Sequence, residues 1–172
     1  MKASIEQTEL LKAMAKVQSI VERRTTIPIL SNVLIEAKDS SLYLRTTDLD
    51  IEVLDKVEAI IETPGSLTVG ANTLYEIVRK LPDGSRVEFL NEIGSSQLEI
   101  VASRSRFFLS TLPKEDFPVM ASEEYDFDFT IKAKLIKRLF DKSKFAMSSE
   151  ETRYYLNGVY LHPCIENEKN IL

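Results

Sequence analysis

Three carboxylates alternate along the segment TDLDIE, at Asp48, Asp50 and Glu52. Side chains two residues apart on a strand point to the same face, so the three would gather where they could ligate Mg²⁺. Such a site would support a metal-dependent nuclease. No histidine, lysine base or second acidic cluster stands at a catalytic spacing from it, and there is no glycine-rich phosphate loop. The sequence therefore favours an acid-rich turn and a solvated strand, with the nuclease as the weaker alternative.

A different chemistry is offered by ETRYYLNGVYL, in which Arg153 directly precedes Tyr154 and Tyr155. A guanidinium pairs with phosphate, and a tyrosine presents a hydroxyl to phosphate or a ring face to an exposed base. These residue types indicate nucleic-acid binding, which includes the class of general single-stranded nucleic-acid binding modules. The structural alternative is that one tyrosine fills the core and Arg153 forms a surface ion pair.

Basic residues are unevenly distributed in this chain, whose net charge is −5. The segment 132–144 has six basic residues and only Asp141 as an acid, whereas the segment 36–62 has eight acidic residues and three basic ones. This distribution predicts a positive face on a negative body. Such a face can attract a polyanion although the total charge cannot.

The composition excludes several classes of protein. With 172 residues and 44% hydrophobic content, the chain can bury a core. The single cysteine, Cys164, excludes an internal disulfide, and one histidine, His162, leaves no Cys/His cluster for zinc. There is neither a signal-peptide core nor an apolar run of membrane-spanning length. We therefore expect a cytoplasmic protein with no membrane partner, metal or cofactor.

The predicted elements follow a repeated order. Residues 7–22 have the spacing of an amphipathic helix, with Thr8 as its expected N-cap. Three predicted strands follow, at 29–37, 41–46 and 51–61. The order then restarts with a short strand, a helix from near Asn72 to the stop at Pro82, and strands at 85–92, 97–102 and 106–112. Residues 111–126 have linker composition, and residues 129–147 restart the strand-helix pattern a third time.

Shifts of 64 and 126 residues superimpose the three helices and align four apolar positions. The same shifts bring Lys16, Lys80 and Lys142 together on the polar side, and Lys12 with Arg138. Packing explains the apolar stripe, whereas the lysine register indicates either a shared function or merely a solvated helix face. Two units predict an α+β domain with two helices on one face of an antiparallel sheet, and that face is basic.

Four segments carry more specific information: RRTTIPILSNVLIEA, TTDLDIEV, SRSRFFLSTLPKEDFP and ETRYYLNGVYL. In order and spacing they resemble the bacterial sliding clamp family, the beta subunits of DNA polymerase III, from Met1 to about Leu161. The resemblance implies the DNA clamp fold, with repeated strand-helix-three-strand units and two helices packed on an antiparallel sheet in each domain. It also implies a complete first clamp domain at 1–122, then a linker and the incomplete start of a second at 123–172.

The family resemblance implies a DNA sliding clamp, a non-catalytic processivity factor that encircles duplex DNA and tethers the replicative polymerase. This chain resembles its N-terminal fragment. The implied partners are duplex DNA, the replicative polymerase, the clamp loader, other proteins with a clamp-binding motif, and the second chain of a homodimeric ring. Because a ring holds DNA by topology, its inner helices need only a diffuse positive potential, which lysine supplies.

The resemblance and the helix register together assign the candidate site residues. The DNA contacts are Arg24, Arg153, Tyr154, Tyr155, Lys12, Lys16, Lys80, Arg138 and Lys142. A glutamine of the family, shortly before the tyrosines, is here Glu150 or Glu151.

Further assignments concern protein partners. Arg104 and Arg106 match arginines that face acids of the partner chain across the dimer interface, and at i and i+2 on a strand they would share one face. Without the resemblance they would be solvated edge-strand charges. Leu156 matches one wall of a pocket for short clamp-binding peptides, most of which comes from beyond Leu172.

Overall fold

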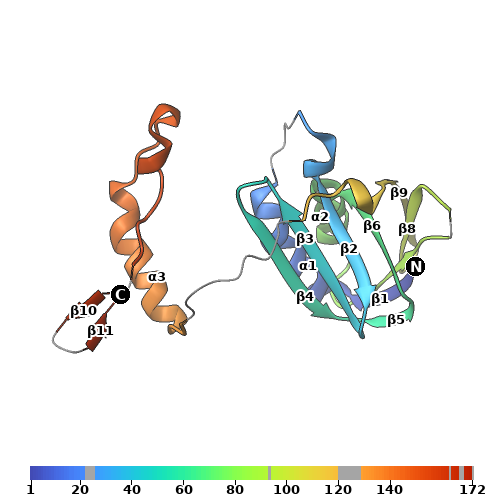
Figure 1. Ribbon diagram of the computed structural model, residues 1–172. Helices are drawn as coiled ribbons and strands as arrows, with labels where there is room; N and C mark the ends of the chain where they lie inside the picture. The colour runs from blue at the N-terminus through green and yellow to red at the C-terminus, as the bar shows by residue number, and fades with distance from the viewer. Residues whose placement is uncertain (22–25, 93, 120–128, 163, 167–168, 172) are drawn as a thin grey trace. The chain divides into compact units, whose positions relative to one another are not determined.

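The computed structural model describes residues 1–21, 26–92, 94–119, 129–162, 164–166 and 169–171 (Figure 1). The chain consists of two compact units, Met1–Ser122 and Glu123–Leu172. They are described separately below as the first and the second unit.

Two similar halves make up the first unit. The first half contains β1 (Lys2–Glu6), α1 (Gln7–Val17), β2 (Asn32–Lys38), β3 (Ser41–Thr47), β4 (Glu52–Glu58) and β5 (Ile60–Thr63). The second half contains β6 (Gly65–Gly70), α2 (Ala71–Lys80), β7 (Arg86–Leu90), β8 (Gln97–Ala102) and β9 (Ser105–Leu112). Short 3-10 turns lie at Gln18–Ile20, Pro28–Ser31 and Lys114–Asp116. Each half therefore has the predicted order of strand, helix and three strands, with β5 added in the first.

The strands form one antiparallel sheet of nine, in the order β4-β3-β2-β6-β9-β8-β7-β1-β5. Its two end strands, β4 and β5, are separated in sequence only by Ala59, whose N–H donates to the Ser40 carbonyl. The prediction of a single strand over 51–61 is therefore wrong. The chain leaves its pairing with β3 at this point and continues as β5 beside β1.

Both helices cover one face of the sheet and lie side by side (Figure 1). Alternate strand residues such as Leu42 and Leu44 point to this face and are fully buried. The apolar stripe predicted for the first helix is buried as well: Leu10, Ala13, Met14 and Val17. Each large side chain buried in this way contributes about 1.5–3 kcal/mol, so the shared core holds the two helices in place. The predicted α+β arrangement, with two helices on one face of an antiparallel sheet, is confirmed.

Helix α1 begins at Gln7, and Glu6 rather than the expected Thr8 is its N-cap residue. The Gln7 N–H donates to the Ser85 carbonyl at 2.8 Å, and the Gln7 side chain donates to the Val78 carbonyl at 2.8 Å. The first turn is thus tied to the second half of the unit. These tertiary hydrogen bonds replace the side-chain cap that Thr8 was expected to supply.

A second, smaller core lies on the opposite face of the sheet. Ile29, Leu30, Leu34 and Phe117 are buried together there. Pro28 opens a 3-10 turn that directs Ile29 and Leu30 into this cluster, so β2 begins at Asn32 rather than at the predicted residue 29. Residues 114–117 cover the same cluster after β9, and they anchor the end of the first unit.

The described residues of the second unit form one helix and one pair of short strands. Helix α3 (Ala133–Ser143) is followed by 3-10 turns at Lys144–Ala146 and Glu151–Leu156. Strands β10 (Cys164–Glu166) and β11 (Lys169–Ile171) pair with each other. Residues 129–132 form no strand, so only the helical part of the third predicted strand-helix pattern is present. None of the described helices, in either unit, combines the length and the apolar composition needed to cross a membrane.

Candidate nucleic-acid interface

Three predicted DNA-contact lysines belong to the two helices of the first unit. Lys12, Lys16 and Lys80 are all exposed, whereas the apolar stripes of α1 and α2 face the sheet. Because the two helices lie side by side, they present cations over one helical layer. The side chains are long and hydrated, so they suit exchangeable contacts with an anionic backbone.

Two of these three lysines have carboxylate partners within the chain. The Lys12 ammonium contacts Glu9 Oε1 at 2.7 Å, and this hydrogen bond raises the pKa of Lys12. The Lys16 ammonium contacts Asp55 Oδ2 of β4 at 2.9 Å. Lys80 has no ion pair among the residues that the structure describes. The three cations at the predicted register are therefore not equally available to a ligand.

Asp55 was not among the predicted site residues, although a sequence signal for it exists. It lies between Val53 and Val57 on the side of β4 that faces the helices. A carboxylate at an inward position of an alternating strand indicates a nearby cation. The sequence does not show which lysine the fold brings next to Asp55.

Helix α3 supplies the cations of the second unit. Arg138 and Lys142 are exposed and make no ion pair with any described residue. Lys137 and Lys144 both contact Asp141, the latter at 2.8 Å. The hydrogen bonds from Lys137 and then Lys144 lower the pKa of the Asp141 carboxyl group. The basic segment thus retains unpaired cations on an exposed helix.

The segment with the two tyrosines forms a 3-10 turn over Glu151–Leu156. Tyr154 and Tyr155 are 78% and 71% exposed, and their rings meet edge to face with centroids 5.8 Å apart. Neither ring fills a core. Arg153 contacts Glu150 Oε2 at 3.4 Å, and its φ of −118° interrupts the turn. The surface ion pair of the structural alternative is therefore present, whereas its buried tyrosine is not.

The two arginines predicted on one strand face occupy different elements. Ser103, with a φ of 53°, and Arg104 form the two-residue turn between β8 and β9, so Arg104 is not on a strand. Arg106 lies on β9 and contacts Glu99 Oε1 of β8 at 2.7 Å. The i, i+2 argument is wrong, because the tight hairpin closes at the pair of Ala102 and Ser105. Both arginines are nevertheless exposed at the same end of β9.

The start of β9 has an open edge. Strand β9 pairs with β8 over its first six residues, whereas its pairing with β6 is limited to Thr111 and Leu112. A pocket of 510 Å³ lies beside this edge, with Ile77, Leu81 and Phe107 in its lining. An unpaired strand edge next to apolar side chains is a surface on which another strand can add.

Two further residues were assigned to partner or DNA contacts, Leu156 and Arg24. Leu156 is 45% exposed at the end of the 3-10 turn, and its carbonyl accepts a hydrogen bond from the Ser148 N–H at 2.9 Å. Arg24 lies outside the described residues. The structure therefore presents Leu156 as an accessible apolar side chain and gives no geometry for Arg24.

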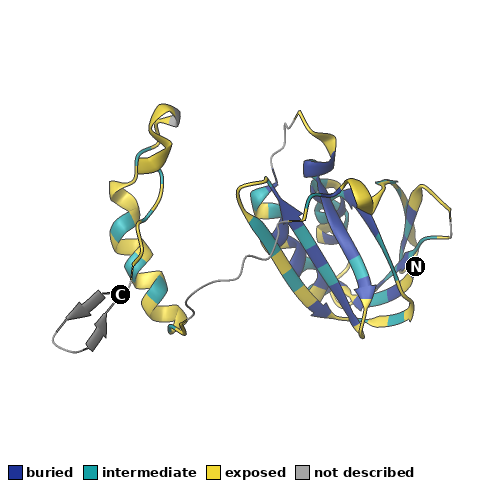
Figure 2. Cartoon of the chain, in the orientation of Figure 1, coloured by how far each residue is buried: buried dark blue, intermediate teal, exposed yellow. Residues whose placement is uncertain are grey.

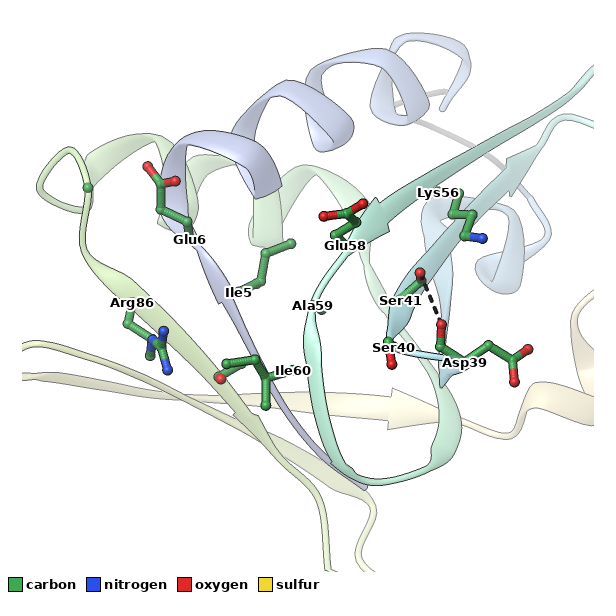
Figure 3. A pocket seen from close by; sticks show the side chains of 12 residues that line it. Ile5, Glu6, Asp39, Ser40, Ser41, Lys56, Glu58, Ala59, Ile60 and Arg86 are labelled. Carbon is green, nitrogen blue, oxygen red and sulfur yellow. Dashed lines mark hydrogen bonds between the residues drawn. The ribbon is translucent and has the colours of Figure 1, made fainter.

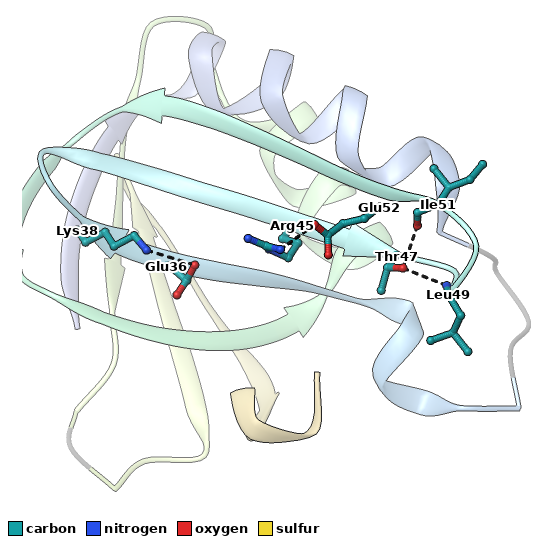
Figure 4. A network of polar contacts seen from close by, with 7 residues as sticks. All are labelled: Glu36, Lys38, Arg45, Thr47, Leu49, Ile51 and Glu52. Atoms are coloured by element: carbon teal, nitrogen blue, oxygen red, sulfur yellow. Dashed lines mark hydrogen bonds and ion pairs between the residues drawn. The ribbon is translucent and has the colours of Figure 1, made fainter. Parts of the chain in front are cut away.

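The acidic segment does not form a metal site. Asp48 Oδ1 accepts hydrogen bonds from the N–H groups of Asp50 and Ile51, so it holds the β3–β4 turn. Glu52 contacts Arg45 at 2.7 Å (Figure 4). In the described ranges no three His, Cys, Asp or Glu residues are grouped so that they could hold a metal ion. Asp48 and Glu52 therefore have structural partners, and the segment does not support the nuclease interpretation.

An open pocket of 710 Å³ lies near the junction of β4 and β5, and Figure 3 shows its lining. The charged side chains there are of both signs: Glu6, Asp39, Lys56, Glu58 and Arg86. None of the predicted DNA-contact or interface residues belongs to this lining. The pocket therefore has no connection with the predicted site.

Comparisons with known proteins agree with this architecture. The family described as DNA polymerase III beta subunit, N-terminal domain, matches residues 1–121. The beta sliding clamp of Caulobacter vibrioides (strain NA1000 / CB15N) is 52% identical over 162 residues, which are 94% of this chain and 44% of that protein. The beta sliding clamp of Escherichia coli (strain K12) is 36% identical over 161 residues, 92% of this chain and 43% of that protein.

A solved structure gives the same result. The DNA polymerase sliding clamp from Caulobacter crescentus matches with a TM-score of 0.93 and 50% identity, over 99% of this chain and 46% of that one. The chain therefore spans less than half the length of the relatives it matches. Sequence and fold agree over nearly all of its residues, and the chain belongs to the beta sliding clamp family, the beta subunits of DNA polymerase III.

Proposed function

We propose that this chain is the N-terminal part of a DNA sliding clamp, a ring that encircles duplex DNA and tethers the replicative polymerase. In this role it is a non-catalytic accessory subunit of a DNA-directed DNA polymerase, a nucleotidyltransferase, and it acts in the cytoplasm. The observation that carries the proposal is the helical layer of the first unit. Two adjacent helices cover one face of the sheet and expose Lys12, Lys16 and Lys80.

The chemistry of this layer fits sliding. Lysine ammonium groups attract phosphates without contacting base edges, so they favour no particular position along the duplex. Topology would keep the ring on DNA, and the helices would add only a weak, exchangeable attraction. A net charge of −5 does not prevent this, because acids are concentrated in the segment 36–62 and basic residues in the segment 132–144.

The exposed tyrosines and arginine of the second unit supply a different kind of contact. Tyr154 and Tyr155 are largely exposed, and Arg153 is held only by a partly solvated pair with Glu150. In the proposed clamp they contact DNA, together with Arg24, Arg138 and Lys142. Glu150 weakens the Arg153 contact, since it competes with phosphate for the same guanidinium.

The open edge of β9 is the proposed site of ring closure. A strand of the partner chain would extend the sheet there and cover Phe107, while Arg104 and Arg106 would meet acids of that partner. Leu156 would form one wall of the pocket for clamp-binding peptides of the polymerase, the clamp loader and other partners. Through these protein contacts the proposed ring would tether the polymerase to DNA.

The proposal is tested in a chimaeric clamp in which residues 1–172 replace the matching segment of the Caulobacter vibrioides relative. Changing Lys16, Lys80 and Lys142 to Glu should weaken DNA association, and each lost phosphate contact should reduce the salt slope by about 0.9. Lys56→Glu on the outer face of β4 is the control for one such charge reversal away from the helices. An unchanged slope in the triple variant would reject the helical layer as the DNA-facing surface.

Ring closure is tested in the same chimaera. Arg104→Glu with Arg106→Glu should shift the dimer toward monomer in sedimentation, because like charges would then face each other across the interface. Lys114→Glu, at an exposed position after β9, controls for charge alone. Full retention of the dimer would place the two arginines outside the interface.

A second candidate function, the single-stranded nucleic-acid binding module, is favoured only by the exposure of Tyr154 and Tyr155. It predicts tight, salt-sensitive binding of short single-stranded oligonucleotides by this chain alone, lost when both tyrosines become alanine. The clamp proposal predicts only weak binding of linear DNA. A direct titration with both kinds of DNA separates the two.

A further inference from the structure

One carboxylate of the first unit stands where packing favours an apolar side chain. Asp55 is paired with Leu44 in the sheet and points to the helix-covered face, as do Val53 and Val57 on either side of it. Leu44 is fully buried, and Asp55 is only 21% exposed. An acid at such a position loses hydration, so its presence needs a compensating partner.

That partner is the Lys16 ammonium on α1, 2.9 Å from Asp55 Oδ2. The two groups come from elements 39 residues apart that pack against each other. The lysine side chain is 64% exposed, whereas the carboxylate is largely shielded. The geometry therefore holds an anion beneath a cation that is still accessible from solvent.

We propose that Asp55 is an intramolecular counter-charge that occupies Lys16 and limits its use as a phosphate contact. The inference rests on the proposed function, in which the helical layer faces DNA. A carboxylate and a phosphate accept from the same ammonium donor, so a bound duplex has to displace Asp55 or share Lys16 with it. As a consequence, the first unit binds the duplex more weakly at Lys16.

The other cations of the layer show why this pair is different. Lys80 has no ion pair among the described residues, so it is free to meet a phosphate. Glu9, the partner of Lys12, is 50% exposed on the same helix, and such helix-surface pairs are weak and easily exchanged. Asp55 instead is fixed by a strand and partly removed from water. Of the described lysines in the layer, Lys16 is thus the one whose partner lies on a strand and is shielded from water.

The test is a double-mutant cycle on the 172-residue chain, titrated with a short DNA duplex between about 20 and 200 mM salt and followed by amide NMR shifts. Asp55→Asn should raise the duplex affinity and steepen the salt slope by up to about 0.9, the value of one phosphate contact. Lys16→Ala should alter the slope little in the native background and by about 0.9 in the Asp55→Asn background. A merely structural role of Asp55 would not produce this coupling.

Three variants act as controls. Glu58→Gln removes the same charge from the same strand on the face away from the helices, and it should leave the slope of the native chain unchanged. Asp55→Glu keeps the counter-charge and should also behave as the native chain. Lys80→Ala should reduce the slope by about 0.9 in both Asp55 backgrounds.

The outcomes separate the inference from the function on which it rests. Equal effects of Lys16→Ala in the two Asp55 backgrounds, with a normal Lys80 effect, would overturn the counter-charge and leave the clamp proposal intact. Loss of the Lys80 effect in every background, or no response of any variant to the duplex, would overturn both.

Discussion

Helices α1 and α3 have the same length and the same place in the repeat, but only α1 is buried. Each has 11 residues, and a shift of 126 maps Gln7–Val17 onto Ala133–Ser143. At aligned positions Met14 is fully buried, whereas Phe140 is 43% exposed. Figure 2 shows the contrast as dark blue elements in the first unit and only intermediate or exposed residues in α3.

The difference lies in the strands that accompany each helix. Strands β3 and β4 carry residues against which α1 packs, whereas the described strands of the second unit are the short pair β10 and β11. An amphipathic stripe specifies a helix, but its burial depends on a sheet with enough strands to cover it. The same local pattern therefore has very different stability in the two units.

The largest expected consequence concerns hydrogen exchange. Amides of Val33, Ile35 and Leu44 should exchange at least ~1,000-fold more slowly than those of Leu139 and Phe140, since the former open only when the first unit unfolds. The measurement is amide exchange of the monomeric chain, with sedimentation as the check on its oligomeric state. Equal, strong protection of α3 in a proven monomer would show that it is stable without further strands.

Matched truncations test the same contrast in energy. Leu10→Ala should destabilise the first unit by about 2–5 kcal/mol, because it leaves a cavity in a close-packed core. Ile136→Ala at the aligned position should change this stability by less than ~0.5 kcal/mol, since α3 contributes no buried side chain. Urea unfolding followed by first-unit amides measures both. Similar losses for the two variants would contradict the contrast.

Much of the first unit was predictable because its repeat is visible in the sequence. The apolar stripes of the helices and the alternation of the strands are local patterns, and both are present as predicted. The break at Ala59 was not predictable, since it depends on where β5 meets β1. By contrast, the turn at Arg104 was visible in the sequence, since the predicted strands at 97–102 and 106–112 leave Arg104 between them, and only the i, i+2 argument treated it as a strand residue.

The candidate site was predictable in its residue types and less so in its pairings. The cations at the helix register are exposed as expected. Their carboxylate partners depend on tertiary contacts, so the pairing of Lys16 with Asp55 could not be read from spacing.

A smaller effect is expected at the end of α1. The buried Thr46 hydroxyl donates to the Val17 carbonyl at 2.6 Å, so β3 caps the last turn. Thr46→Val keeps the shape but removes the donor, and it should cost about 1–3 kcal/mol of unfolding free energy. Thr8→Val is the control, because Thr8 makes no cap hydrogen bond, and it should cost less than ~0.5 kcal/mol. A larger loss for Thr8→Val would restore Thr8 as the helix cap.

The smallest effect concerns the pH dependence of α3. Lys137 and Lys144 lower the pKa of Asp141 in the folded helix, so the pair stabilises the helix above the ordinary aspartate pKa of about 3.9. This contribution is lost as the pH falls through the lower pKa of the folded state. The Cα shifts of Leu139 and Phe140 should therefore move toward coil values below about pH 4. In α1 the aligned residue is Ala15, so that helix lacks this dependence.

The matched variant Asp141→Asn isolates this contribution from general acid unfolding. It should show reduced α3 helicity near neutral pH and little further change on acidification, because the amide does not titrate. High salt should also shrink the difference between the native chain and the variant, since all three side chains are solvent-exposed and their attraction is screened. An identical pH profile for both proteins would show that the two lysines do not stabilise α3 through Asp141, and its helicity would then have to come from residue propensity alone.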